Sequence, residues 1–394
     1  MYQFEAEKSP RFAGENHVLV ATVFLLTGVG LVTLYSASYA FASRFFRDGG
    51  LHFISGQLKA AGVGMALFFL ASRVNLDVLR KLIKLLVVFA IILCALTFVP
   101  GIGDTRNGVS RWIKLPGGRT FQPSEIVKLV LPLYLAHILD KKQDGLDKFS
   151  TGILPPVLIT ALFFILIHLQ NNLSTALFIA LNALVVFFLA GLKLRYFFSA
   201  VVMILPLAGL LILAREHRLR RLISLIKPEW DPLGAGYQVA SSVRTIISGG
   251  LWGKGLGRGT RKIASIPEVY SDFVFASFAE ESGFLGVVFV FVLFGVFACL
   301  AYRGALRARD TFRRLLAFSL VTTIVSQALV NVAIVSGSLP VAGYTLPFFS
   351  AGGSSLVVTL LMAGLVVNVC RSRTDYRPQD VFNTGAAGEG VYAG

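Results

Sequence analysis

The chain has 394 residues, of which 55% are hydrophobic and 15% are charged, whereas about 25% of the residues in a soluble globular protein are charged. These proportions exclude a soluble enzyme. The formal net charge of +16 would suggest a nucleic-acid partner in a soluble protein, but here its meaning depends on where the basic residues lie around apolar segments, so we expect no nucleic-acid partner.

Apolar segments long enough to cross a bilayer recur along the chain. A hydrocarbon core of about 30 Å requires roughly 20 apolar residues in a helix. Ten segments of this kind are predicted, at 18–42, 53–72, 82–99, 121–139, 152–169, 174–191, 196–214, 283–302, 315–337 and 354–370. The expected fold is therefore an all-α polytopic integral membrane protein with about ten transmembrane helices.

Basic residues gather in alternate connections between these segments. The positive-inside rule assigns such connections to the cytoplasm. The basic residues that mark this side include Lys8, Arg11, Arg73, Arg80, Lys141, Lys142, Arg303, Arg307, Arg371 and Arg373. An even number of spans then places both termini in the cytoplasm and the long 215–282 segment, between the seventh and eighth spans, outside the cytoplasmic (inner) membrane.

Two of the outer segments are also basic. The segment 100–120 contains Arg106 and Arg111, and the long outer segment contains Arg258. A basic outer surface indicates an anionic ligand, and contact with lipid headgroups is the alternative. Within the long segment, 215–227 has the spacing of an interfacial amphipathic helix, and 237–248 has apolar residues on one helical face.

The membrane domain is predicted to extend over residues 1–371. The polar, glycine-rich residues 372–394 follow it, and we expect them to form a disordered cytoplasmic tail.

Ionisable residues at membrane depth are energetically costly, so each of them is a candidate functional residue. The first two in the chain are Glu125 and Lys128, which follow Pro123 at the predicted start of a helix. Three residues apart, they share one helical face and can neutralise each other. A structural ion pair and a ligand-binding role both remain open for this pair.

A second candidate is Asp272, which opens an aromatic, apolar run at the outer end of a predicted helix. Glu280 lies about 12 Å further along that helix. A partly desolvated carboxylate has a raised pKa, which suits a general base near neutral pH. A helix N-cap is the alternative role for Asp272, and Glu268, Glu280 and Glu281 compete with it as the base.

The third group comprises Gln327 and Asn331 in the ninth span and the outer loop that follows. The two amides are one helical turn apart and are candidate substrate-binding residues, and interhelical hydrogen bonding is the alternative explanation. The loop ends at Ser354 and Ser355, where the backbone N–H groups at the start of the tenth helix can hold an anion such as phosphate. A plain helix cap is the alternative.

These segments together resemble the SEDS family (shape, elongation, division and sporulation; RodA/FtsW) of peptidoglycan polymerases. The resemblance covers nearly the whole chain and is carried by the segments 110–113, 121–128, 231–238, 271–276, 280–283 and 339–355. The segments 218–222, 253–257 and 266–268 are more similar to the division-type members than to the elongation type.

The resemblance implies a glycosyltransferase that polymerises lipid II into glycan strands, with its active site on the outer face of the membrane. It implies that Asp272 takes the proton from the acceptor sugar hydroxyl while undecaprenyl pyrophosphate leaves the donor. Arg111 and Lys128, with Arg106 or Arg258, would neutralise the pyrophosphate. The implied cofactor is a divalent cation, Mg²⁺ or Mn²⁺, and no organic cofactor is expected. The implied partners are a class B penicillin-binding transpeptidase and other membrane proteins of the division or elongation machinery.

Two other functions are compatible with the sequence. A lipid II flippase would require a path of polar groups reaching the cytoplasmic half of the spans, and a non-catalytic scaffold for a cell-wall transpeptidase would tolerate loss of Asp272. The chain also departs from the family pattern at Gly56, at Asn171 and Asn172, and at Ala351, so no role is assigned to these positions.

Overall fold

The computed structural model describes residues 10–45, 49–106, 109–116, 119–145, 148–231, 234–259 and 270–371. The helices are α1 (Pro10–Phe45), α2 (His52–Ala71), α3 (Leu76–Leu96), α4 (Pro123–Lys141), α5 (Leu154–Leu169), α6 (Leu173–Leu189), α7 (Leu194–Leu213), α8 (Glu216–Ile226), α9 (Ala235–Ser248), α11 (Val274–Leu306), α12 (Thr311–Val335) and α13 (Gly353–Arg371). Short helical turns lie at η1 (Gly49–Leu51), η2 (Gln143–Gly145), η3 (Phe149–Ile153) and η4 (Pro228–Trp230). The strands are β1 (Gly103–Arg106), β2 (Val109–Leu115) and β3 (Arg119–Phe121).

Each of the ten predicted spans lies on a helix. Among the described residues, seven helices are long and apolar enough to cross a membrane, and α6 is a shorter apolar helix. The helices α1 and α11 begin earlier than the predicted positions 18 and 283, and the two predicted outer helices correspond to α8 and α9. The predicted helical architecture is therefore confirmed, while the tail predicted at 372–394 lies outside the described residues.

A small antiparallel sheet follows α3, where the sequence predicted only an outer connection. The strand β2 pairs with β1 through Gly103 opposite Ile113, and with β3 through Ile113 opposite Phe121. The sheet is an addition to the all-α prediction. It places Arg111 in the central strand.

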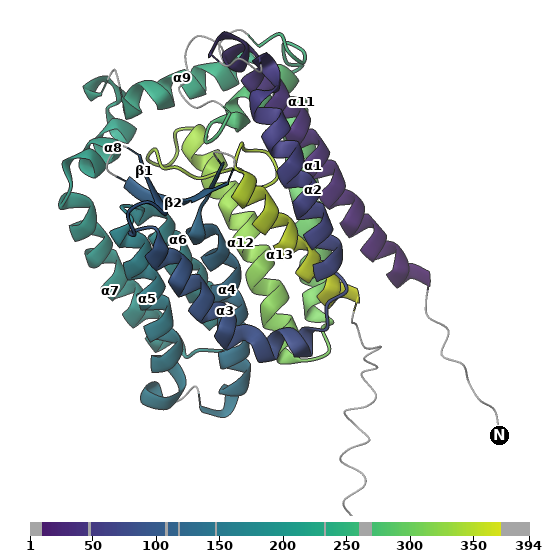
Figure 1. Ribbon diagram of the computed structural model, residues 1–394, viewed down its shortest axis with the longest axis vertical. Helices are drawn as coiled ribbons and strands as arrows, with labels where there is room; N and C mark the ends of the chain where they lie inside the picture. Colours follow the sequence, from purple (N-terminus) through teal and green to yellow (C-terminus); the bar gives the residue numbers. More distant parts are fainter. Residues whose placement is uncertain are drawn as a thin grey trace, which may run out of the picture.

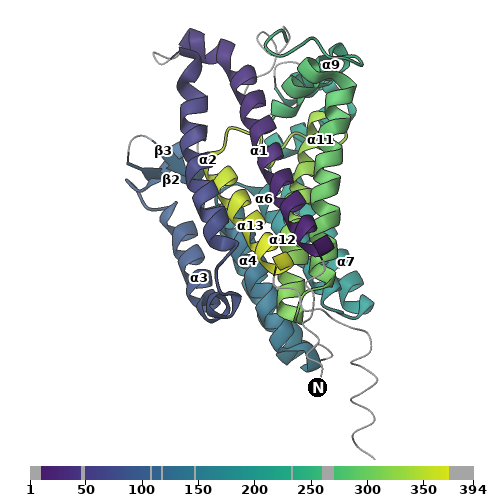
Figure 2. The same cartoon turned by 90° about the vertical axis from the view of Figure 1, so that its right-hand side faces the viewer.

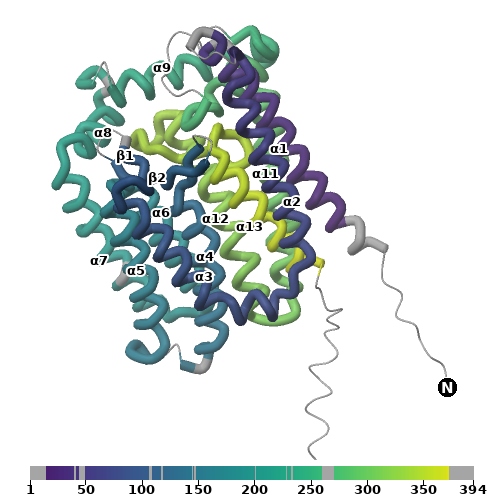
Figure 3. Tube along the Cα trace, viewed as in Figure 1, coloured from purple at the N-terminus to yellow at the C-terminus, as the bar shows by residue number. Residues whose placement is uncertain are grey.

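The helices form a bundle with distinct ends (Figure 1). The sheet, α8 and α9 lie towards one end, while the start of α1 and the end of α13 lie at the opposite end. Figure 3 shows the same path as a tube, with α12 and α13 in the middle of the bundle and α7 at its edge. Both ends of the described chain thus lie at the same end of the bundle.

The loop between α12 and α13, residues 336–352, folds back into the bundle. Phe348 is buried and has a positive φ of 70°. Gly30 of α1 lies directly against it, because a Cβ built on Gly30 would be 2.2 Å from the Phe348 carbonyl oxygen. Gln57 of α2 donates from Nε2 to the carbonyl of Ser350 (2.9 Å). The close packing of α1 and α2 therefore fixes the course of this loop.

Candidate functional site

Asp272 lies in the turn that leads into α11. Its side chain is half-buried and accepts a hydrogen bond from Ser271 Oγ at Oδ1 (3.0 Å). Its backbone carbonyl accepts a hydrogen bond from Asn331 Nδ2 of α12 (2.9 Å). On the other side, a Cβ built on Gly343 would lie 3.3 Å from Asp272 Oδ2. The backbone of Asp272 is thus held by α12, and its carboxylate lies beside the 336–352 loop.

Asn331 and Gln327 of α12 hold this loop in place. Asn331 Nδ2 also donates to the carbonyl of Tyr344 (2.5 Å), and Gln327 Nε2 donates to the carbonyl (2.9 Å) and Oγ1 (3.0 Å) of Thr345. The predicted pair therefore bonds to the loop and to the Asp272 turn. Both residues thus connect α12 to the loop that adjoins Asp272.

Glu125 and Lys128 belong to the same hydrogen-bonded network. Lys128 Nζ lies 2.8 Å from Glu125 Oε1 and 2.9 Å from Gln327 Oε1, and only 4% of Lys128 and 6% of Glu125 is exposed. The network continues from Gln327 to Thr345, whose Oγ1 is 2.9 Å from Ser355 Oγ at the start of α13. Lys128 is thus bonded to internal partners, and α4, α12, α13 and the loop are joined at one point.

Ser354 precedes Ser355 in the first turn of α13 and is half-buried. It therefore lies next to this network.

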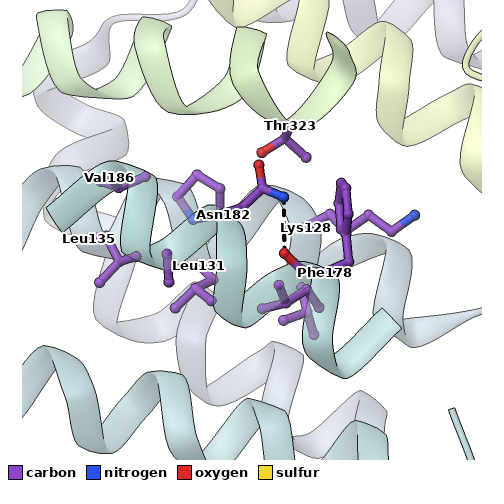
Figure 4. A pocket seen from close by; sticks show the side chains of 11 residues that line it. Lys128, Leu131, Leu135, Phe178, Asn182, Val186 and Thr323 are labelled. Carbon is purple, nitrogen blue, oxygen red and sulfur yellow. Dashed lines mark hydrogen bonds between the residues drawn. The ribbon is translucent and has the colours of Figure 1, made fainter. Parts of the chain in front are cut away.

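A pocket lies beside Lys128 between α4, α6 and α12 (Figure 4). Leucine and valine side chains form much of its lining, and Asn182 Nδ2 donates to the carbonyl of Phe178 within it (2.9 Å). Figure 4 shows the amino group of Lys128 directed away from Leu135 and Val186. The pocket is mainly apolar and is separate from the Asp272 carboxylate.

Arg111 of β2 lies within electrostatic range of Asp272. It is half-buried, and its guanidinium donates to the carbonyls of Gln170 (3.4 Å) and Asn171 at the turn between α5 and α6. Burial and the neighbouring Arg221 lower the pKa of Arg111 to about 10, and the negative charge of Asp272 acts in the opposite direction. Arg111 therefore remains protonated at neutral pH, within electrostatic range of both groups.

The helix α8 contributes two further arginines. Arg218 is half-buried and donates from Nη1 to the carbonyl of Leu211 (2.8 Å). Arg221 is exposed, and its Nη1 lies 3.5 Å from the carbonyl oxygen of Val341, two residues before Gly343. Arg221 thus lies against the same loop that adjoins Asp272.

These cations lie close enough to interact, because the charges of Arg221 and Arg218 both lower the pKa of Arg111. Desolvation, followed by the charges of Arg221, Arg218, Arg215 and Arg111, lowers the pKa of His217 on the same helix. We refer to Arg111, Arg218 and Arg221 as the arginine cluster. Arg218 and Arg221 were not predicted as site residues, because the spacing of 215–227 indicated only an interfacial helix. The feature of the sequence that could have indicated them is their position opposite the apolar face of a predicted outer helix.

Other predicted site residues lie elsewhere. Arg258 is exposed on the glycine-rich segment that follows α9, and Glu280 and Glu281 are buried and bonded to that segment. The side chain of Arg106 and the whole of Glu268 lie outside the described residues. Across the ranges that the structure describes, no group of three His, Cys, Asp or Glu residues is suitable for holding a metal ion.

The chain is similar to known membrane proteins over most of its length. The model of the cell cycle protein family of FtsW, RodA and SpoVE matches residues 16–375. A relative from Geobacter sp. (strain M18), named probable peptidoglycan glycosyltransferase FtsW, is 37% identical over 359 residues, which cover 91% of this chain and 97% of that protein. Stage V sporulation protein E of Bacillus subtilis (strain 168) is 36% identical over 355 residues, which cover 90% of this chain and 96% of that protein.

Solved structures show the same fold. One chain of a peptidoglycan synthase complex, described as coordinating polymerization and crosslinking, has a TM-score of 0.75 at 30% identity, with 91% of this chain and 98% of that chain covered. The rod shape determining protein RodA of Thermus thermophilus has a TM-score of 0.66 at 29% identity, with 91% of this chain and 97% of that chain covered.

Proposed function

The chain belongs to the cell cycle protein family of FtsW, RodA and SpoVE, and from this we propose that it is a peptidoglycan glycosyltransferase that polymerises lipid II in cell division or shape. Its active site would face the outside of the cytoplasmic (inner) membrane. The observation that carries this proposal is the position of Asp272. Its side chain is half-buried, its backbone carbonyl is held by Asn331, and it lies within electrostatic range of Arg111.

The geometry supports a single displacement at the donor sugar. Asp272 accepts the proton of the acceptor 4-hydroxyl as that oxygen attacks the anomeric carbon of the donor. The bond between this carbon and the pyrophosphate oxygen breaks, and undecaprenyl pyrophosphate leaves with the bonding electrons. Because one displacement converts an α-linked donor into a β-linked glycan, one basic carboxylate is sufficient.

The leaving group would be bound by the arginine cluster. Its two phosphates gain negative charge as the bond breaks, and fixed guanidinium groups stabilise that charge. The family resemblance implied this role for Arg111 and Lys128, with Arg106 or Arg258. The burial and internal bonding of Lys128 favour a structural role for it, so we assign the pyrophosphate to Arg111 together with Arg218 and Arg221.

We propose that a divalent cation would enter this site together with the substrate. Because the described residues offer no three-residue ligand group, Mg²⁺ or Mn²⁺ would take ligands mainly from pyrophosphate oxygens and water. When bound, the ion would supply additional positive charge for the leaving group.

We further propose a class B penicillin-binding transpeptidase as the partner. The structural relative in a complex that coordinates polymerization and crosslinking supports this assignment. The partner would receive the new glycan strand for crosslinking.

The test is polymerisation of purified lipid II. The purified protein, with and without its candidate transpeptidase, is supplied with lipid II and Mg²⁺ or Mn²⁺, and glycan strands are resolved by gel electrophoresis. We expect strands from the wild type. Failure to form strands even with the partner would contradict the proposal. A lipid II translocation assay in vesicles would then test the flippase function. If no lipid II were translocated, the scaffold function would be favoured.

Replacing both Arg218 and Arg221 by glutamine is expected to lower kcat/KM for lipid II by about tenfold to a hundredfold, because charge-assisted hydrogen bonds to the pyrophosphate are lost. The matched control is Arg220→Gln, which removes an exposed arginine paired with Glu216 on the same helix (2.6 Å). Initial rates at several lipid II concentrations measure the effect. Equal kcat/KM values for the double variant and the control would contradict the assignment of the arginine cluster.

A further inference from the structure

The helix α11 is broken at Gly283. This residue has φ 66° and ψ −170°, so the helix is divided into an outer half, 274–282, and a long inner half, 284–306. In an uninterrupted helix, the amides of residues 284 and 285 would donate to the carbonyls of residues 280 and 281. The break leaves these two donors and two acceptors available for other partners.

The glycine-rich segment 249–259, which we call the strap, binds these four groups. It donates to both carbonyls and accepts from both amides. The bonds are Lys254 N to Glu280 O (3.0 Å), Gly255 N to Glu281 O (3.0 Å), Phe284 N to Gly250 O (2.9 Å) and Leu285 N to Leu251 O (3.2 Å). The strap is thus inserted into the hydrogen-bond ladder of α11.

This insertion depends on glycine at the contact. A Cβ built on Gly253 would lie 2.1 Å from the carbonyl oxygen of Glu281, and one built on Gly283 would lie 2.2 Å from the backbone nitrogen of Gly253. Both glycines also have a positive φ. The two backbones can therefore approach only because neither residue carries a side chain.

Two buried carboxylates fasten the strap to the outer half of α11. Glu280, which is 0% exposed, accepts from Lys254 Nζ at Oε1 (2.6 Å). Glu281 Oε1 accepts from the backbone nitrogen of Gly257 (3.1 Å) and from Ser36 Oγ of α1 (2.7 Å). Figure 2 shows α1 beside α11, with α9 at the end of the bundle from which the strap departs. The strap, α1 and the outer half are joined by these contacts.

The outer half of α11 begins two residues after Asp272. Its first end is held through the Asp272 carbonyl by Asn331, and its second end is held by the strap. If the strap were released, the carbonyls of Glu280 and Glu281 would again be available to the amides of residues 284 and 285. If these bonds formed, α11 would straighten, and Asp272, which lies just before its first residue, would move away from its present position.

We propose that the strap positions Asp272, and that Lys254 and Glu280 are the positioning residues that keep α11 bent in the active arrangement. This inference rests on the proposed polymerase function. Neither residue touches the reacting atoms. Their effect is geometric, and displacement of a catalytic group by about 1 Å can lower a rate on the order of a hundredfold.

The first test is steady-state polymerisation by Lys254→Met. We expect kcat to fall by about tenfold to a hundredfold with little change in KM for lipid II, since the arginine cluster is left intact. The charge-exchanged variant, Lys254→Glu with Glu280→Lys, is expected to recover most of the activity. Arg244→Gln is the matched control, because Arg244 is an exposed cation on α9 that bonds to the carbonyl of Ala240 in its own helix.

The second test is hydrogen exchange of the strap amides in the full-length protein. Lys254 N and Gly255 N are protected by the Glu280 and Glu281 carbonyls, so peptides covering 250–257 should exchange faster in Lys254→Met than in the wild type. Ser36→Ala, which removes one bond to Glu281, provides a milder variant with the same expected direction. Exchange in Arg244→Gln should match that of the wild type.

The outcomes separate this inference from the proposed function. Faster strap exchange with a lower kcat, recovered by charge exchange, supports positioning by the strap. Faster strap exchange with unchanged kcat overturns the inference. It is also overturned if both Lys254→Met and Ser36→Ala show the hydrogen exchange and the activity of the wild type. Absence of polymer from the wild type would instead overturn the polymerase itself.

Discussion

Replacing Asp272 by asparagine is expected to reduce the rate of lipid II polymerisation by about 10³-fold or more without unfolding the protein. Asparagine retains the shape of the side chain, can accept the hydrogen bond from Ser271, and leaves the backbone bond from Asn331 in place. It removes only the basic oxygen that accepts the proton of the acceptor hydroxyl, and a positioned general base contributes on the order of 10²–10⁴-fold to a rate. The measurement is the initial rate of lipid II consumption.

The matched control for this variant is Glu229→Gln, which removes an exposed carboxylate from the same outer segment. Its rate should remain near that of the wild type. Binding of lipid II to Asp272→Asn should also be retained, because the arginine cluster is unchanged. A polymerisation rate within tenfold of the wild type would exclude Asp272 as the general base.

Replacing Lys128 by methionine is expected to lower the free energy of unfolding by about 3–5 kcal/mol, because it leaves the buried carboxylate of Glu125 without its cationic partner. The loss of the bond to Gln327 adds to the effect by loosening α12 from α4. Thermal unfolding in detergent, followed with a thiol-reactive dye, measures the change, since the buried Cys94 and Cys370 become reactive when the bundle opens.

A double variant distinguishes the charge from the packing. Adding Glu125→Gln to Lys128→Met removes the buried negative charge, so the double variant should melt at a higher temperature than Lys128→Met alone. An unchanged melting temperature in the single variant would show that the pair contributes nothing to stability. A double variant no more stable than the single one would attribute the loss to packing against α12.

The sequence determined the helical architecture and the location of the candidate base. Ten apolar segments fall on helices because backbone groups in lipid have to bond within their own segment, which leaves the helix as the local solution. Asp272, Asn331 and Gln327 were identifiable because polar groups beside apolar runs are costly. These features depend on residues close together in the chain, and composition and spacing therefore reveal them.

Tertiary structure decided which of the candidate residues act together. Lys128 was a candidate for pyrophosphate binding until its contact with Gln327, 199 residues away, placed it in an internal network. Arg221 lies at the site because it contacts the carbonyl of Val341 in the loop. The break in α11 is bound by the strap, a segment about thirty residues earlier in the sequence. Such contacts join segments that are distant in the chain and leave no periodic pattern in either one, so only the packed bundle defines them.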